Sequence, residues 1–309
     1  MCLSIVGSAP DCTLVLTINF AYIPLMKFII INGAGNRFGV FDARNQIRGR
    51  SSFTMTPDLA KATAAKNGVI GALGADQIIV MRDAKSKTAD VFMEIWNADG
   101  NEVDACGNAS RCIPWLLMQE TGRDQITLET NAGLLHTTRM GEFSVAVDMG
   151  EPKLEWQQIP LKEYMDTHVI DVKVGPIDAP ILARPGAVNM GNPHCVFFVD
   201  NAEETAVDKV GPMIEFHPLF PEQCNVGFAE IRSPTEIRLR VWERGVGITQ
   251  ACGTGACAAL VAAHRQSRTE RSANIIMDGG TLQIDWRKSD NHVIMTGPVE
   301  LEFEGELEI

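Results

Sequence analysis

The chain has 309 residues, of which 45% are hydrophobic, and this is enough for about two ordinary domains with sizeable cores. Its net charge of −12, from 27 basic and 39 acidic residues, argues against a nucleic-acid partner or an anionic membrane surface. Eight cysteines form no CxxC pair, and no apolar run reaches the roughly 18 to 20 residues that a membrane span needs, so we expect free thiols in a reducing, cytoplasmic compartment.

The first 25 residues differ from the rest of the chain. They include an apolar patch, but no basic segment precedes it and no A-x-A cleavage site follows it. We therefore interpret residues 1–25 as an N-terminal extension outside the core fold and not as a secretory signal. The core is expected to start at Met26, where MKFIIINGAGNRFGVFD predicts a strand followed by a glycine-rich turn.

The segment after Cys106 carries the first helix signal. Apolar side chains between Ile113 and Leu117 precede a stop at Gly122, and they predict a helix that begins just after the cysteine. Pro114 falls inside this run, where it is expected to kink the helix or to tighten its first turns.

Two further elements are predicted in the second part of the chain. In TEIRLRVW, apolar residues alternate with Arg238 and Arg240, which predicts a half-buried strand. After Cys252, small apolar residues recur at helical spacing from Ala256 to Ala263 and predict a helix with one apolar face that can pack close to a neighbour.

The same signals occur twice in one order. GAGNRFGVFD resembles MGNPHCVFFVD, and residues 89–112 resemble residues 235–257. Trp96 and Cys106 have counterparts 146 positions later, at Trp242 and Cys252. The repeat predicts an α+β fold of two homologous halves about a pseudo-two-fold axis, each half a sheet wrapped around one central helix.

The repeat also sets the expected domain organisation. The first half is predicted to occupy residues 26–148 and the second half residues 149–296, with the crossover near Met149. The C-terminal strand, residues 297–309, is expected to return to the first half.

Each repeat places a cysteine before a glycine at the start of a predicted helix. The positive end of a helix dipole stabilises a thiolate, so the pKa of such a thiol can fall well below its usual ~8.5. Two such thiols across a cleft suit the inversion of a carbon that bears a hydrogen, because one removes the proton and the other returns a proton to the opposite face. Cys106 and Cys252 are therefore the candidate acid/base pair. The other cysteines that lie in apolar patterns are expected to be small core residues: Cys112, Cys195, Cys224 and Cys257.

These motifs together resemble the diaminopimelate epimerase family of cofactor-independent amino-acid epimerases, which serve lysine and peptidoglycan synthesis. The resemblance runs from Met26 to near the C-terminus and rests on GAGNRF, WNADGNEVDACGN, MGNPHCVFF, CNVGF, WERGVG and ACGTGACAA. It implies the fold of that family, no cofactor, a homodimer, and diaminopimelate as a small-molecule substrate interconverted between its LL and meso forms. It implies neither a nucleic-acid nor a membrane partner.

The resemblance also implies roles for individual residues. Cys106 and Cys252 are the catalytic pair, and the backbone that cradles the reacting carboxylate comes from Gly107, Asn108, Gly253 and Thr254. The side chains that contact the substrate are Asn36, Gln77, Asn97, Asn192 and Asn225. Glu243 and Arg244 bind the distal amino-acid end of the substrate. Arginine can hold its carboxylate with two parallel hydrogen bonds, and glutamate can pair with its ammonium group. His194 is expected to orient neighbouring groups or to balance protons.

Other interpretations of the motifs stay open. Proline and hydroxyproline racemases share the Cys-Gly-x-Gly motif, so the substrate could be another amino acid. A non-catalytic thiol or metal-binding protein is an alternative of a different class, although neither half offers a CxxC or HxxxH cluster and we expect no metal site. Arg37, Ile248 and Pro114 depart from the family pattern at positions around the thiols.

Overall fold

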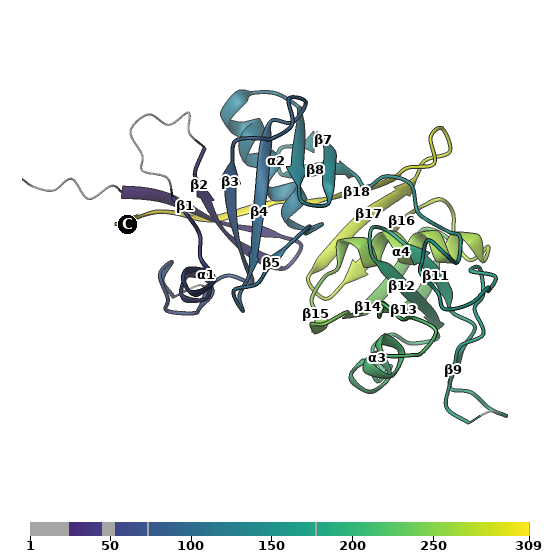
Figure 1. Cartoon of the computed structure of the whole chain (residues 1–309). Helices are drawn as coiled ribbons and strands as arrows, with labels where there is room; N and C mark the ends of the chain where they lie inside the picture. Colours follow the sequence, from purple (N-terminus) through teal and green to yellow (C-terminus); the bar gives the residue numbers. More distant parts are fainter. Residues whose placement is uncertain (1–24, 45–52, 73, 177, 309) are drawn as a thin grey trace, which may run out of the picture.

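The computed structural model describes residues 25–44, 53–72, 74–176 and 178–308 (Figure 1). The predicted N-terminal extension lies outside these residues, apart from Leu25, with which the first strand begins. None of the described helices is both long and apolar enough to span a membrane.

The first half contains two helices, α1 (Pro57–Ala64) and α2 (Ala109–Thr121). Its strands are β1 (Leu25–Gly33), β2 (Asn36–Asp42), β3 (Gln77–Arg82), β4 (Val91–Asn97), β5 (Glu102–Val103), β6 (Gln125–Thr130), β7 (Gly133–Gly141) and β8 (Ser144–Asp148).

The second half repeats this order with helices α3 (Val207–Glu215) and α4 (Gly253–Arg265). Its strands are β11 (Gly186–Asn189), β12 (Pro193–Val199), β13 (Asn225–Ser233), β14 (Glu236–Glu243), β15 (Gly247–Thr249), β16 (Ser272–Met277), β17 (Gly280–Trp286) and β18 (Val293–Pro298). A separate pair, β9 (Lys173–Val174) and β10 (Leu182–Ala183), lies between the halves in the chain, and β19 (Glu300–Glu308) ends it.

One hydrogen-bonded sheet of 17 strands runs through both halves. The halves join where β8 pairs antiparallel with β18, with Val147 opposite Met295. The last strand, β19, pairs antiparallel with β1 of the first half (Figure 1). The described part of the chain therefore starts and stops in the same half, although the second half lies between these two strands in sequence.

The two halves have the same topology. In each, two parallel strands follow one another, β2 with β3 and β12 with β13, and a second parallel pairing joins β4 to β6 and β14 to β16. A parallel pair requires a crossover connection, which is often helical. Helices α1 and α3 lie in the first crossover of each half, and α2 and α4 lie in the second. Each half therefore has the one central helix that was predicted, together with a short crossover helix, α1 or α3, that the sequence pattern did not reveal.

The central helices are enclosed more completely than their sequence pattern predicted. Helix α4 packs against seven strands of the second half, and every residue from Ala256 to Ala263 is at most 1% exposed. The predicted single apolar face was too narrow, because alanine and cysteine side chains let strands approach the helix on every side. Pro114 lies inside α2, which continues to Thr121.

The half-buried strand predicted at TEIRLRVW is confirmed as β14, but one arginine on its polar face is buried. Arg238 is 6% exposed and is paired with Glu203 at 2.7 Å and with Asp278. It also donates to the carbonyl of Ile276 at 3.2 Å. A buried arginine is tolerated where its charge and donors are satisfied, and sequence alternation alone does not show such partners.

Candidate active site

The two predicted cysteines each lie at the start of a central helix. Cys252 is the N-cap of α4, and its sulfur accepts a hydrogen bond from the backbone N–H of Gly255 at 3.3 Å. The sulfur of Cys106 accepts from the backbone N–H of Ala109, the first residue of α2, at 3.5 Å. Both thiols therefore lie at the positive end of a helix, as the sequence predicted.

The two Cys-Gly motifs meet in space. A Cβ atom added to Gly107 would lie 3.4 Å from the Cα of Gly253, and the reverse distance is the same. Met295 of β18 packs against both glycines, so that a Cβ on Gly253 would lie only 2.9 Å from its sulfur. Segments 146 positions apart thus place their helix starts in contact, and the absence of side chains at both glycines permits the close approach.

The pKa values of both thiols correct one expectation from the sequence. Burial raises the pKa of Cys106 to about 11, and burial followed by the charge of Glu243 raises that of Cys252 well above its ordinary value. The backbone N–H groups at the helix starts act in the opposite direction at both residues. Desolvation of the free site therefore outweighs the helix termini that were expected to lower these pKa values.

Glu243 lies beside Cys252 at the end of β14. Its carboxylate accepts from the hydroxyl of Thr249 at 2.5 Å, and burial raises its pKa. Cys252 acts to lower the pKa of Glu243, and Glu243 acts to raise that of the thiol. The charge of Glu243 also raises the pKa of Cys106. The sequence pointed to Glu243 only as a contact to the distal end of a substrate, and nothing in the local pattern indicated its closeness to both thiols.

Asn108 connects the first half to the second. Its side-chain N–H donors reach the side-chain oxygen of Asn36 and, at 3.4 Å, the carbonyl oxygen of Ala251, which directly precedes Cys252. Its own side-chain oxygen accepts from Arg111 at 3.1 Å. The structure therefore brings Asn36 and Asn108 to the same place as both thiols, as the family resemblance implied.

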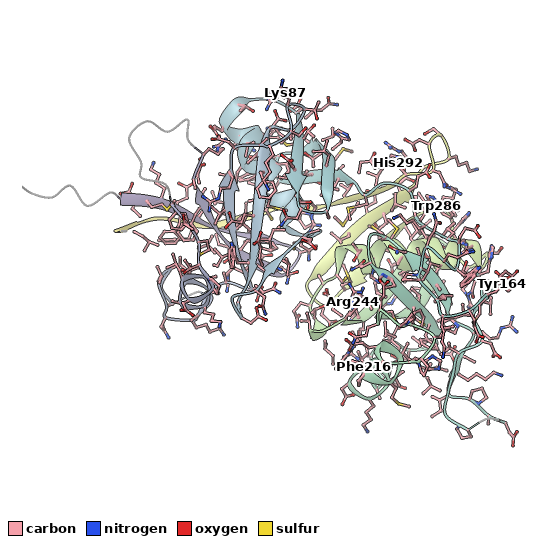
Figure 2. All side chains as sticks on the ribbon, viewed as in Figure 1. Lys87, Tyr164, Phe216, Arg244, Trp286 and His292 are labelled. Carbon is pink, nitrogen blue, oxygen red and sulfur yellow. The ribbon has the colours of Figure 1, made fainter. Side chains whose placement is uncertain are left out.

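The remaining predicted amides form two groups. Gln77 of β3 donates to Asn97 of β4 at 2.8 Å, and the two residues are opposite each other in the sheet. Asn225 is buried and its oxygen accepts from the backbone N–H of Arg244 at 3.0 Å. The Arg244 side chain lies on the side of the second half that faces the first (Figure 2) and donates to the carbonyl of Glu222 at 2.9 Å.

His194 is held as a neutral ring. It is 1% exposed, and burial together with the charge of Arg244 lowers its pKa to about 3. Its Nε2 lies 2.9 Å from the side-chain oxygen of Asn192, and because that oxygen can only accept, Nε2 carries the proton. Of the two roles expected for His194, this geometry favours orienting Asn192 over balancing protons.

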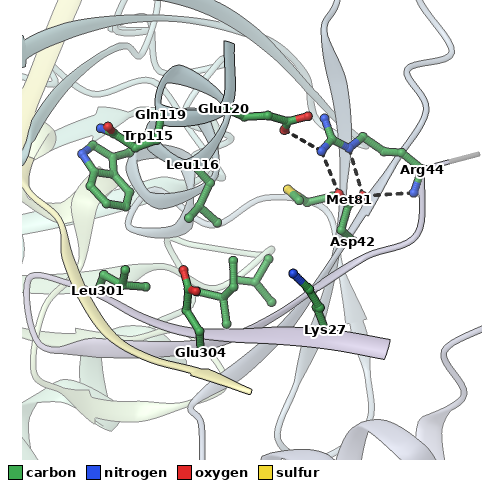
Figure 3. Close-up of a pocket in the computed structure, with 12 residues that line it drawn as sticks. Lys27, Asp42, Arg44, Met81, Trp115, Leu116, Gln119, Glu120, Leu301 and Glu304 are labelled. Carbon is green, nitrogen blue, oxygen red and sulfur yellow. Dashed lines mark hydrogen bonds and ion pairs between the residues drawn. The ribbon is translucent and has the colours of Figure 1, made fainter. Parts of the chain in front are cut away.

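A separate pocket lies away from these residues. It is on the first half, between α2 and strands β1 and β2, with β19 along one side (Figure 3). Apolar residues such as Trp115 and Leu301 line it together with charged groups such as Arg44, and none of the predicted site residues takes part. Among the described residues no group of three or more metal-ligating side chains occurs.

Sequence comparison with known proteins identifies the relatives of this chain. The family model described as diaminopimelate epimerase matches residues 28–155 and 186–302. A diaminopimelate epimerase from Caulobacter vibrioides is 48% identical over 283 residues, covering 91% of this chain and 96% of that protein. One from Phenylobacterium zucineum is 51% identical over 280 residues, covering 91% and 97%.

Solved structures show the same fold at low sequence identity. A hydroxyproline epimerase from Agrobacterium vitis aligns with a TM-score of 0.63 at 15% identity, covering 93% of this chain and 94% of that one. A phenazine biosynthesis PhzC/PhzF protein from Clostridium difficile aligns with a TM-score of 0.62 at 13% identity, covering 92% and 100%. The fold is thus shared by several enzymes, and the sequence relatives distinguish among them. The chain belongs to the diaminopimelate epimerase family.

Proposed function

We propose that this protein is an isomerase that interconverts LL- and meso-diaminopimelate without a cofactor, using Cys106 and Cys252 as its two acid/base groups. The contact between Gly107 and Gly253 carries this proposal, because it brings the two Cys-Gly motifs to one place. The names of the sequence relatives support the choice of substrate.

The reaction needs one thiolate and one thiol at the same time. The thiolate takes the proton from the α-carbon, and the electron pair of the broken C–H bond moves toward the α-carboxylate. The second thiol then gives its proton to the opposite face of the carbon, and the two sulfurs have exchanged protonation states. In this mechanism the backbone N–H groups of Gly107, Asn108, Gly253 and Thr254, at the starts of α2 and α4, stabilise the charge that develops on the carboxylate.

The pair of Glu243 and Cys252 explains how a buried thiol can exchange its proton. Because each group influences the pKa of the other and burial raises both pKa values, one proton shared between them avoids two adjacent negative charges. We assign Glu243 this proton exchange in addition to pairing with the distal ammonium group of the substrate. Arg244 completes the proposed recognition of the distal end, and Asn97 and Asn225 are proposed contacts to the substrate.

Replacement of each cysteine tests the two-base mechanism. Cys106→Ala and Cys252→Ala should each lower the epimerisation rate by at least about 100-fold, because each removes one of the two proton-transfer groups. The measurement is the appearance of the second stereoisomer and the exchange of the α-hydrogen in heavy water. Cys195→Ala, which removes a buried sulfur from β12, is the control and should keep activity. Wild-type epimerisation by either alanine variant at the proposed site would contradict the mechanism.

A substrate panel distinguishes the proposal from its alternative on the same fold. The hydroxyproline epimerase among the structural neighbours shows that this fold can carry another substrate. Turnover of proline or hydroxyproline in place of diaminopimelate would favour that alternative. Homodimer formation, a cytoplasmic location and the division into halves at residues 26–148 and 149–296 stay predictions.

A further inference from the structure

Arg111 is a completely buried cation beneath the proposed site. It lies in the first turn of α2, five residues after Cys106, and its side chain is 0% exposed. Burying an arginine is costly unless its charge and donors have partners, so its surroundings need an explanation.

The partners of Arg111 leave its charge without a carboxylate. One terminal nitrogen donates to Asn108 at 3.1 Å, and the other lies 3.6 Å from the sulfur of Met295, which is a weak acceptor. The Nε atom has no hydrogen-bond partner, and within the described part of the chain no ion pair joins Arg111 to an acidic residue.

The guanidinium group lies at the junction of the two halves. A Cβ added to Gly297 of β18 would lie 2.9 Å from its Nε, and one added to Gly33 of β1 would lie 3.5 Å from a terminal nitrogen. Met295, which contacts Arg111, also packs against Gly107 and Gly253. The cation is therefore packed between the two halves, next to the point where the two cysteine motifs meet.

The titratable groups that face this cation are thiols. They are Cys112 on α2, Cys106 three residues before that helix, and Cys257 on α4, and each acts to raise the pKa of Arg111 against the effect of burial. Cys106 is also faced by Glu243 on β14, whose charge acts on the thiol in the direction opposite to that of Arg111. Of the three thiols, Cys106 is the one assigned to proton transfer.

We propose that Arg111 is a positioning residue of this site: its fixed charge stabilises an anion at Cys106, and its hydrogen bond to Asn108 holds the amide that bridges the two halves. The inference rests on the proposed function, since that function assigns proton transfer to Cys106. The missing carboxylate agrees with this role, because the counter-anion exists only when the thiol is ionised.

The second half lacks this cation. The residue 146 positions after Arg111 is Cys257, a buried neutral group. Cys252 instead lies beside Glu243, an acid. The pseudo-symmetric site is therefore electrostatically asymmetric, with a permanent cation near Cys106 and a carboxylate, Glu243, whose charge acts on both thiols.

The test measures the ionisation of Cys106 without substrate. The full-length protein and its variants are alkylated with iodoacetamide over a range of pH, and mass spectrometry follows the rate at the Cys106 peptide. The variants are Arg111→Gln and Arg111→Met, which remove the charge, and Arg111→Lys, which keeps it. Cys257→Ala is the matched control, because it alters the corresponding turn of α4 without removing a charge. Thermal unfolding is recorded for each variant.

We expect the neutral variants to need a higher pH for half-maximal alkylation, since a nearby cation favours the ionised form. Arg111→Lys should stay close to the wild-type profile, with a lower kcat because it loses the planar group that holds Asn108. Cys257→Ala should melt at a lower temperature with no shift of the profile.

A folded neutral variant with the wild-type alkylation profile overturns the inference. If both neutral variants fail to fold, Arg111→Lys decides: a wild-type profile supports the charge, and a profile shifted to higher pH contradicts it. Because no substrate is present, these outcomes do not depend on whether the protein accepts diaminopimelate. If the wild-type protein does not turn over diaminopimelate but the neutral Arg111 variants still shift the alkylation profile, the proposed function is refuted and the inference about Arg111 is not.

Discussion

Cys106 and Cys252 have nearly the same local sequence but different neighbours. Both accept a backbone N–H from the start of a helix, yet only at Cys252 is the charge of Glu243 the main influence on the thiol pKa after burial. The sequence predicted the shared part, because a cysteine before a helix start is a local pattern. It did not predict the position of Glu243, because that depends on how β14, β15 and the start of α4 fold together.

Neutralising Glu243 tests its role at the residue scale. Glu243→Gln removes the acceptor that shares a proton with Cys252, so kcat should fall by about 100-fold, the size typical of a lost acid/base group. The thiol should ionise at lower pH in this variant, since the charge of Glu243 raises the pKa of Cys252. Steady-state rates over a range of pH measure both effects.

Glu236→Gln is the matched control for this change. Glu236 lies at the opposite end of β14 from Glu243, so the same substitution there should leave kcat unaltered. An unchanged kcat in Glu243→Gln would remove the carboxylate from the mechanism and leave it only a contact to substrate.

At the scale of elements, helix α3 fixes the turn that carries Glu243 and Arg244. Glu215, at the end of α3, is 2% exposed and accepts from the ring N–H of Trp242 and from the backbone N–H of Gly245, both at 2.7 Å. Gly211 of α3 lies directly against the Trp242 ring, so any Cβ at that position would overlap the ring. The helix therefore holds both ends of the Glu243–Arg244 pair.

Gly211→Ala should push α3 away from β14. In an exposed helix this change stabilises by about 1 kcal/mol, but overpacking against Trp242 should cost about 1–3 kcal/mol, so we expect a net loss. Chemical denaturation measures the free energy of unfolding, and KM reports the displaced turn. Met213→Ala, at a side chain of α3 that is 59% exposed, should change stability by at most about 0.5 kcal/mol. Equal stability of Gly211→Ala and wild type would show that the contact is loose.

Sequence periodicity predicted α2, α4 and β14, since each of them has a regular apolar pattern and clear limits. It missed α1 and α3, which are short and interrupted or flanked by proline, as at Pro57 and Pro212. The burial of Arg111 and Arg238 was also missed, because a charged residue is normally read as exposed. Its burial here depends on partners from distant strands, and no local pattern encodes them.

At the scale of the whole molecule, the halves are joined by the pairing of β8 with β18 and by a charge cluster beside it. Asp148, the last residue of β8, accepts from His292 at 2.8 Å and from Arg287 at 2.9 Å, both of the second half. These contacts lie next to the antiparallel pair of Ile294 and Asp148. They therefore reinforce the junction of β8 and β18, called the seam below, on which the relative placement of both cysteine motifs depends.

The contact between His292 and Asp148 should make the stability of this seam depend on pH. The hydrogen bond to Asp148 raises the pKa of His292 above its ordinary value of 6.5. A histidine with a raised folded-state pKa contributes stability that is fully present below the unfolded-state pKa and is lost as pH rises through the folded-state value. The contribution should therefore be present at about pH 5.5 and absent at about pH 8.5. Because both side chains are partly exposed to solvent, the effect should be small.

His292→Gln should consequently lower the melting temperature more at about pH 5.5 than at about pH 8.5, because only the protonated ring forms the ion pair. Thermal unfolding of wild type and variant at both pH values measures the difference. His136→Gln is the control, since His136 of β7 faces the hydroxyl of Thr127 and no carboxylate pairs with it among the described residues. The control should show the same difference from wild type at both pH values. If His292→Gln also shows a pH-independent difference, the ion pair does not stabilise the seam, and the β8–β18 pairing must hold the two halves together by its backbone hydrogen bonds and core packing alone.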